Sequence, residues 1–99
     1  MAVVYILHSS SIDQYYIGSC FDLNQRIEQH LNKVHQNAFT RKANDWKLFF
    51  EINNLEYQTA RKIEAHIKMM KSRTYIENLV RYPEITQKLI EKYHSDSAR

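Results

Sequence analysis

Apolar stretches alternate with short polar segments in the first part of the chain, a pattern typical of β-strands. Residues 2–7 form a continuous β-branched and aromatic run, and residues 14–19 form a second run after the polar segment 8–13. Two such runs so close together predict an antiparallel hairpin. A third apolar run at 46–52 predicts another strand, which the Asn-Asn pair at 53–54 is expected to end.

Between the second and third strands, the apolar residues take on helical spacing. Asp22 with Gln25 three residues later forms a capping signature, and Leu23, Ile27 and Leu31 follow at helical intervals. This pattern predicts a helix from about residue 22 to residue 33. A short helical turn is expected at 39–42.

Helical periodicity also dominates the second half of the chain. Residues 55–71 are expected to form a long helix, whose apolar stripe consists of Ala60, Ile63, Ile67 and Met70. A shorter helix is predicted at 74–81 and a last one at 84–94. Pro83 should separate them, because proline disfavours helical backbone in the residue before it.

These elements define a fold class. The order β-β-α-β-α-α predicts an α+β fold, a small three-stranded antiparallel sheet flanked by helices. A length of 99 residues suits one domain, which we expect to span residues 1–94, with a flexible tail at 95–99. The hydrophobic content of 43% is sufficient for one buried core.

Gly18 is the only glycine of the chain, and it lies within the second predicted strand. A glycine in a strand indicates a positive φ, a β-bulge, or a backbone that another group must approach closely. All three explanations remain open from the sequence. Whichever holds, Gly18 marks a special position.

Charge and cysteine content narrow the setting only a little. The formal net charge of +3 permits an anionic partner without requiring one. The single cysteine, Cys20, cannot form an internal disulfide, and the scattered histidines do not make a zinc pattern. No basic segment followed by a long apolar stretch opens the chain, so we expect a cytoplasmic protein without a membrane partner. Cys20, His8, His35 and His66 receive no specific role.

A set of residues in the hairpin and the helices resembles the GIY-YIG nuclease superfamily over about residues 2–80. Tyr5, the segment 16–18 (Tyr-Ile-Gly), Arg26 and Glu64 match in type, order and approximate spacing. In the first motif only the tyrosine is retained, because residues 3–5 read Val-Val-Tyr in place of Gly-Ile-Tyr. The chain looks most like small stand-alone members that resemble the nuclease domain of the bacterial excision-repair incision subunit.

The resemblance implies a metal-dependent DNA endonuclease that hydrolyses phosphodiester bonds in DNA repair, recombination or processing. It also implies one divalent ion, Mg²⁺ or Mn²⁺, held by Glu64. A carboxylate oxygen suits these ions, which keep several waters when few carboxylates bind them. A cation beside the reacting phosphorus would stabilise the charge that develops there.

Four polar side chains are expected to meet near the rim of the sheet. Arg26 and His30 are four residues apart, so they share a helix face and can reach one phosphate. Tyr5 and Tyr16 could present their hydroxyls to the same place. By resemblance, Tyr5 is a candidate general base and Tyr16 a positioning group. Because a phenol ordinarily has a pKa near 10, His30 is kept as an alternative base.

Nucleic-acid contacts are predicted from basic residues and from the resemblance. A candidate track of cations for the DNA backbone consists of Arg41, Lys42, Lys47, Lys68, Lys71 and Arg73. Gly18 would let a strand approach the backbone, and Asn78 falls where the resemblance implies an important asparagine. Residues 71–78 open a helix whose first amides could meet a phosphate, although a capped turn explains the segment equally well.

Each candidate also has a simpler interpretation. Glu64 and Lys68 have the spacing of an ordinary surface ion pair, and tyrosines favour strands for packing alone. The alternative function is a catalytically inactive module that retains the nuclease fold to bind nucleic acid or protein. An RNA-targeting protein is a third class. Sequence specificity should be low, and a protein partner or a homodimer could supply the specificity that the domain lacks.

Overall fold

The computed structural model describes residues 2–21 and 43–94. Its elements, in chain order, are β1 (Ala2–Ser9), β2 (Gln14–Cys20), β3 (Trp46–Leu55), α2 (Tyr57–Met70), α3 (Arg73–Arg81) and α4 (Pro83–Lys92). The three strands form one antiparallel sheet, so the predicted α+β architecture is confirmed. The helix predicted at 22–33 and the turn predicted at 39–42 lie outside the described residues.

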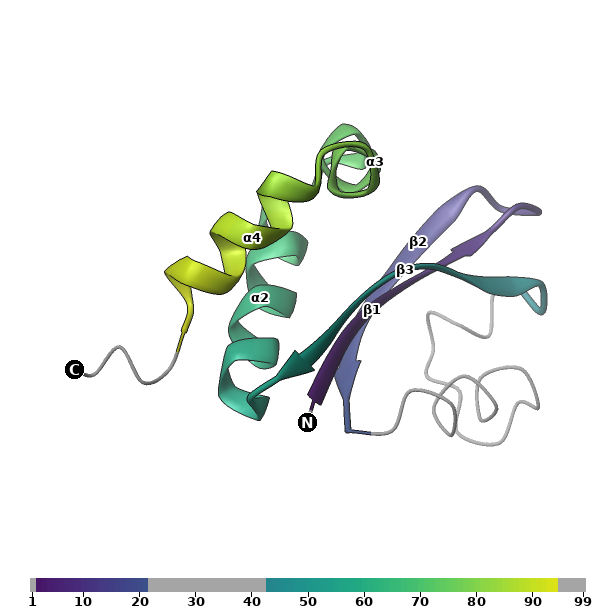
Figure 1. Cartoon of the computed structure of the whole chain (residues 1–99). Coiled ribbons are helices and arrows are strands. Elements are labelled where there is room, and N and C mark those ends of the chain that lie inside the picture. The colour runs from purple at the N-terminus through teal and green to yellow at the C-terminus, as the bar shows by residue number, and fades with distance from the viewer. Residues whose placement is uncertain (1, 22–42, 95–99) are drawn as a thin grey trace.

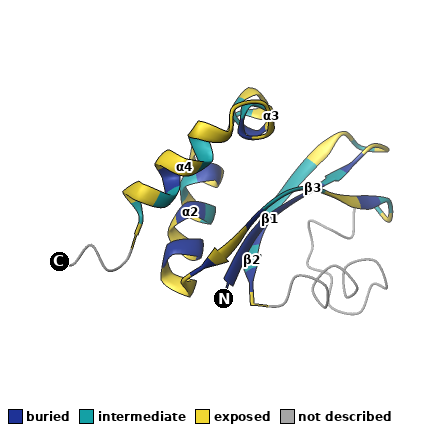
Figure 2. Ribbon diagram, viewed as in Figure 1, coloured by how far each residue is buried: buried dark blue, intermediate teal, exposed yellow. Residues whose placement is uncertain are grey.

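Strand β1 is the centre of the sheet, which has the order β2-β1-β3. It pairs with β2 in an unbroken register from Val3 opposite Cys20 to Ser9 opposite Gln14. All residues from Ala2 to Leu7 are buried, at 0–8% exposure (Figure 2). A strand covered on both faces needs apolar side chains in both directions, which explains the continuous apolar run.

The two faces of the sheet carry different side chains, because successive residues of a strand point to opposite sides. Helices α2, α3 and α4 all lie on one side of the sheet (Figure 1), which we call the helical face. Ala2, Val4 and Ile6 of β1 join the core on that face. The opposite face carries the buried cluster Tyr5, Leu7, Cys20 and Trp46. None of the helices in the described ranges is long and apolar enough to cross a membrane.

Hydrogen bonds join Asp45, the residue before β3, to Ser9 and Ser11 at the turn between β1 and β2. The Ser9 hydroxyl donates to Asp45 Oδ1 at 2.5 Å, and the Ser11 backbone N–H donates to Asp45 Oδ2 at 2.9 Å. These bonds favour the carboxylate and lower the pKa of Asp45 to about 2, the Ser9 hydroxyl having the largest effect. Residues far apart in the sequence are thereby held at one end of the sheet.

The predicted end of the third strand was wrong. Strand β3 continues through Asn53-Asn54 to Leu55, and α2 starts at Tyr57 instead of residue 55. Leu55 is buried at 4% exposure and pairs with Ala2, and both contacts stabilise the longer strand. Asn54 has a φ of 61°, so it accommodates the register irregularity there without ending the strand.

The other boundaries differ from the prediction by one or two residues. Strand β1 continues to Ser9 and β2 to Cys20, α3 starts at Arg73, and α4 spans Pro83–Lys92. Proline is favoured in the first turn of a helix, where its missing N–H has no partner to lose. Pro83 therefore begins the last helix and separates it from α3, as expected.

Candidate functional site

Helix α2 presents a row of polar and aromatic side chains beside the edge strand β2. Tyr57, Arg61, Glu64 and Lys68 follow one another at intervals of three or four residues, which places them on one side of the helix. Glu64 lies midway along this row. We call the surface between this side of α2 and β2 the seam.

Glu64 is held by two partners at the seam. The Ser19 hydroxyl of β2 donates to its Oε1 at 2.5 Å, and the Lys68 ammonium donates to its Oε2 at 2.7 Å. The Glu64 side chain is only 16% exposed. A carboxylate with both oxygens bonded in a half-buried place has one fixed orientation, which a ligand or catalytic group requires.

Ser19 belongs to the candidate site and was not predicted from the sequence. Strand alternation puts Ser19 on the same face as Ile17, which packs against the helical core. That alternation was visible in the sequence. The contact with Glu64 was not, because it joins residues 45 positions apart.

Tyr5, Tyr16 and Gly18 lie together on the opposite face of the sheet. The Tyr5 and Tyr16 rings have centroids 6.3 Å apart, and Tyr5 is buried at 1% exposure. Gly18 pairs with Tyr5 in the register between β1 and β2. The predicted proximity of the two tyrosines therefore appears in the fold.

The structure decides why residue 18 is a glycine. Gly18 has no positive φ, and the register between β1 and β2 contains no bulge. A Cβ atom at this position would lie 2.5 Å from the Tyr5 hydroxyl oxygen and 2.6 Å from Cζ. Close approach of the Tyr5 ring is therefore the explanation that holds.

Tyr5 and Glu64 contact adjacent residues of strand β2 from opposite faces of the sheet. The Tyr5 hydroxyl lies over Gly18 on one face, and Glu64 bonds to the next residue, Ser19, on the other. In the described sheet β2 is an edge strand, so its outer side has no strand neighbour there. Both groups therefore lie at the same place along this edge, Tyr5 buried at 1% exposure and the Glu64 side chain 16% exposed. Arg26 and His30, predicted for the same place, lie outside the described residues.

The arrangement around Glu64 suits a site with a single protein carboxylate. The described residues contain no group of three or more His, Cys, Asp and Glu side chains that could hold a metal. Glu64 Oε2 accepts a hydrogen bond from a cation, the Lys68 ammonium, at 2.7 Å. A divalent ion with one carboxylate would take its other ligands from water and substrate phosphate. Glu64 fits that requirement.

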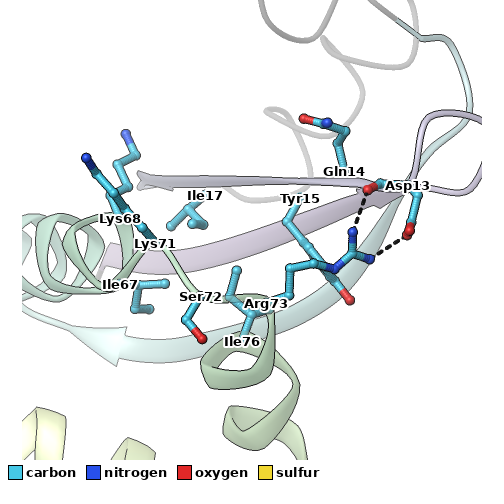
Figure 3. Close-up of a pocket in the computed structure, with 10 residues that line it drawn as sticks. All are labelled: Asp13, Gln14, Tyr15, Ile17, Ile67, Lys68, Lys71, Ser72, Arg73 and Ile76. Atoms are coloured by element: carbon cyan, nitrogen blue, oxygen red, sulfur yellow. Dashed lines mark hydrogen bonds and ion pairs between the residues drawn. The ribbon is translucent and has the colours of Figure 1, made fainter.

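A cleft of about 270 Å³ opens next to Glu64, between β2 and the corner that joins α2 to α3 (Figure 3). It is lined by Asp13, Gln14, Tyr15, Ile17, Ile67, Lys68, Lys71, Ser72, Arg73 and Ile76. Lys68 and Lys71 lie at one end of the cleft and the Arg73–Asp13 pair at the other, with Ile17 and Ile67 nearer the lysines. Lys68 belongs to both the cleft and the Glu64 contact.

Arg73, predicted to bind DNA, is engaged by the hairpin turn. Its guanidinium donates to the Asp13 carbonyl oxygen at 3.1 Å and to Asp13 Oδ1 at 2.6 Å. It also lies over the Tyr15 ring, 5.4 Å from the centroid. The Arg73 hydrogen bond, followed by that of His8, lowers the pKa of Asp13. Arg73 thus anchors the turn to the start of α3.

An exposed aromatic pair ends the seam on the other side of Glu64. The rings of Phe21 and Tyr57 stack with centroids 4.8 Å apart and planes within 11°. Arg61 donates to the Tyr57 hydroxyl at 2.8 Å and lies over its ring. Phe21 is 65% exposed, which is unusual for such a large apolar side chain. No role was predicted for Phe21 or Tyr57 from the sequence.

The remaining predicted nucleic-acid residues do not gather in one place. Lys47 lies on β3, the edge strand on the other side of β1 from the seam. Asn78 lies half-buried in α3, where its carbonyl oxygen accepts the Tyr82 N–H at 2.8 Å. Arg41 and Lys42 lie outside the described residues. Lys68, Lys71 and Arg73 are the predicted cations that line the cleft, and Lys68 and Lys71 lie together at one end of it.

Comparison with known proteins identifies the family of the chain. The family model for the GIY-YIG catalytic domain matches residues 1–77, most of the chain. The protein therefore belongs to the GIY-YIG family and has a nuclease-type domain. Such nucleases act on DNA and generally depend on a divalent metal. A search of curated proteins and of solved structures found no significant match.

Proposed function

We propose that this protein is a divalent-metal-dependent DNA endonuclease in which Glu64 is the metal ligand. The observation that carries the proposal is the half-buried Glu64 carboxylate, oriented by Ser19 and Lys68 at the step of β2 that the Tyr5 hydroxyl covers. A role in DNA repair, recombination or processing, and a kinship with the excision-repair incision subunit, belong to the same proposal. Mg²⁺ and Mn²⁺ are the candidate ions.

The reaction is the hydrolysis of one phosphodiester bond. The oxygen of a water forms a bond to phosphorus, the bond from phosphorus to the 3′-oxygen breaks, and the 3′-oxygen receives a proton. The bound ion would supply stabilisation of the negative charge that develops on the phosphate oxygens. The protein must place the phosphate, accept the proton of the water and limit competing geometries.

Among the described residues, we assign groups to three tasks: orienting the metal ligand, binding the phosphate and accepting the proton of the water. Ser19 and Lys68 fix the direction of both Glu64 oxygens. Lys68 is in addition a cation beside the cleft, where a phosphate oxygen could accept its N–H bonds. The Tyr5 hydroxyl is the proposed general base, with Tyr16 beside it as the group that orients water or binds phosphate.

Arg26 and His30 complete the proposal from the sequence. Arg26 would bind the scissile phosphate with its two-pronged guanidinium, and His30 is the alternative base. The Tyr5→Phe and His30→Ala variants distinguish the two bases through the pH dependence of the rate. A variant that keeps the full rate between pH 6 and 9 has not lost the base.

Cleavage assays with a matched pair of carboxylate variants test the proposed function. Labelled plasmid, branched and single-stranded DNA are incubated with Mg²⁺ or Mn²⁺, with EDTA as a control. Glu64→Gln keeps the size of the side chain and removes its charge, so we expect a loss of at least about 100-fold in rate. Glu84→Gln changes an exposed carboxylate on α4 and should leave the rate unchanged.

A second variant tests the positioning role of Ser19. Removing the hydroxyl with Ser19→Ala should raise the metal concentration required for half-maximal rate by about 10-fold to 100-fold, as is usual for residues that orient a metal ligand. The maximal rate at saturating metal should fall much less. No cutting of any DNA by the folded wild-type protein would favour the inactive binding module, and cutting of RNA alone would favour the third class.

A further inference from the structure

We propose that the cleft between β2 and the α2–α3 corner binds one unpaired nucleotide of the DNA strand, with the phosphate at Lys68 and Lys71 and the base against Ile17 and Ile67. This inference rests on the proposed function, because it assumes a DNA substrate. It adds a substrate preference: DNA that has an unpaired nucleotide close to the scissile bond.

The size and lining of the cleft fit a single nucleotide. Its volume of about 270 Å³ is slightly below the range of about 300–1,000 Å³ for small-ligand sites, and it is too small for the end of a duplex. The apolar part of its lining includes Ile17, Ile67, Ile76 and the ring of Tyr15, which offer apolar contact to a flat base (Figure 3). A base stacked within a duplex has no free face and cannot enter.

The charges of the cleft fit an anion at one end only. At the far end, Arg73 is paired with Asp13 at 2.6 Å, so these two charges largely offset each other. At the near end, Lys68 is shared with Glu64, and Lys71 has no acidic partner within 4.0 Å among residues 2–21 and 43–94. A phosphate beside Lys71 would supply the missing negative charge.

The backbone of Lys71 has a conformation that glycine usually adopts at the end of a helix. Lys71 follows the last residue of α2 and has a φ of 49° and a ψ of 43°, the left-handed conformation that usually takes glycine. A lysine is strained in that conformation, and its backbone N–H makes only a 3.3 Å bond to the Lys68 carbonyl oxygen. Lys71 therefore contributes a cation to the lining of the cleft from a backbone conformation that does not favour lysine.

Binding assays without metal test the inference separately from catalysis. The full chain in EDTA is titrated into a fluorescently labelled single strand and into a duplex of the same sequence. We expect the single strand to bind at least about 10-fold more tightly at equal salt, because only its bases can enter the cleft.

Lys71→Gly is the decisive variant, because glycine suits the left-handed backbone and should not lower the thermal midpoint. We expect single-strand affinity to fall about 10-fold and the slope of log K against log salt to decrease by about 0.7, the value for one phosphate contact. Lys88→Ala removes an exposed lysine from α4, outside the cleft, and should change neither quantity by a comparable amount.

Isoleucine methyl NMR locates the bound base. Titration with a short oligothymidylate should shift the methyl signals of Ile17 and Ile67 and leave that of Ile85 on α4 unmoved. Unchanged binding by Lys71→Gly, or shifts that miss the cleft, would overturn the inference while the nuclease activity stands. Lys71-dependent single-strand binding by a protein that cuts no DNA would instead overturn the proposed function and keep the cleft.

Discussion

The two faces of the sheet share one central strand and have different chemistry. On the helical face, Val4 and Ile6 pack into a hydrophobic core to which α2 contributes Ala60, Ile63 and Ile67. On the opposite face, the neighbouring residues Tyr5 and Leu7 pack with Cys20 and Trp46, which bring a hydroxyl, a thiol and an indole into buried surroundings. Around β1 the helical face is therefore apolar, and its polar pair of Glu64 and Ser19 lies at the β2 edge, whereas the opposite face has polar atoms within its buried cluster.

The candidate site lies where these two faces meet. The edge strand β2 belongs to both faces: Gly18 meets Tyr5 on one, and Ser19 meets Glu64 on the other. A substrate that crosses this edge would have groups from both faces within its reach. Variants on each face measure how tightly that face is packed, and a variant at Gly18 measures how closely Tyr5 approaches β2.

The largest effect is expected from paired truncations in β1. Ile6→Ala and Leu7→Ala remove neighbouring side chains of 0% and 1% exposure that point to opposite faces, so each should lower the free energy of unfolding by about 2–5 kcal/mol. Urea denaturation measures both values. Leu48→Ala, at a residue 41% exposed, is the control and should cost much less. A nearly neutral Leu7→Ala would show that the opposite face is not a packed core.

An intermediate effect is expected from Gly18→Ala. The added methyl group would lie 2.5 Å from the Tyr5 hydroxyl oxygen, so the buried ring must move, at a cost of about 1–3 kcal/mol in unfolding free energy. Combining Gly18→Ala with Tyr5→Leu removes the obstructing atoms. The double variant should therefore lose less stability than the sum of the two single changes. Strict additivity would disprove close approach as the reason for this glycine.

The smallest effect on stability is expected at Asp45, which bonds to Ser9 and Ser11 at one end of the sheet. Its folded-state pKa of about 2 lies below the ordinary value of 3.8, so its contribution to stability is present above pH 4 and is lost as the pH falls toward 2. Asp45→Asn should lower the urea midpoint at pH 7, and the difference from wild type should shrink by pH 2.5. The Glu84→Gln control should show no such convergence. A constant difference across this pH range would contradict the stabilisation by Ser9 and Ser11.

Local pattern was sufficient for most of the elements. The apolar run at 2–7 and the helical stripe on 55–71 predicted β1 and α2, because side-chain periodicity directly reflects which faces are buried. Where prediction failed, a distant partner was responsible: Leu55 is held in β3 by its pairing with Ala2. Propensity at an Asn-Asn pair could not reveal that gain.

The candidate site divides in the same way. The pair of Glu64 with Lys68 was expected from helical spacing, and the structure has it at 2.7 Å. Ser19 as partner of Glu64, and Asp13 as partner of Arg73, could not be expected, since they are 45 and 60 residues apart in the chain. The assignment of catalytic roles to Tyr5, Tyr16, Arg26 and His30 stays a prediction.

By itself, the sequence determined the fold class, the family resemblance and the residue types available for chemistry, because these depend on periodicity and on short motifs. Only the tertiary structure decided why residue 18 is glycine, which hydroxyl orients Glu64, and which of the predicted cations share a cleft. The physical reason is that strand pairing and helix docking bring together groups from distant segments. Their contact energies depend on three-dimensional distance, which local spacing along the chain does not encode.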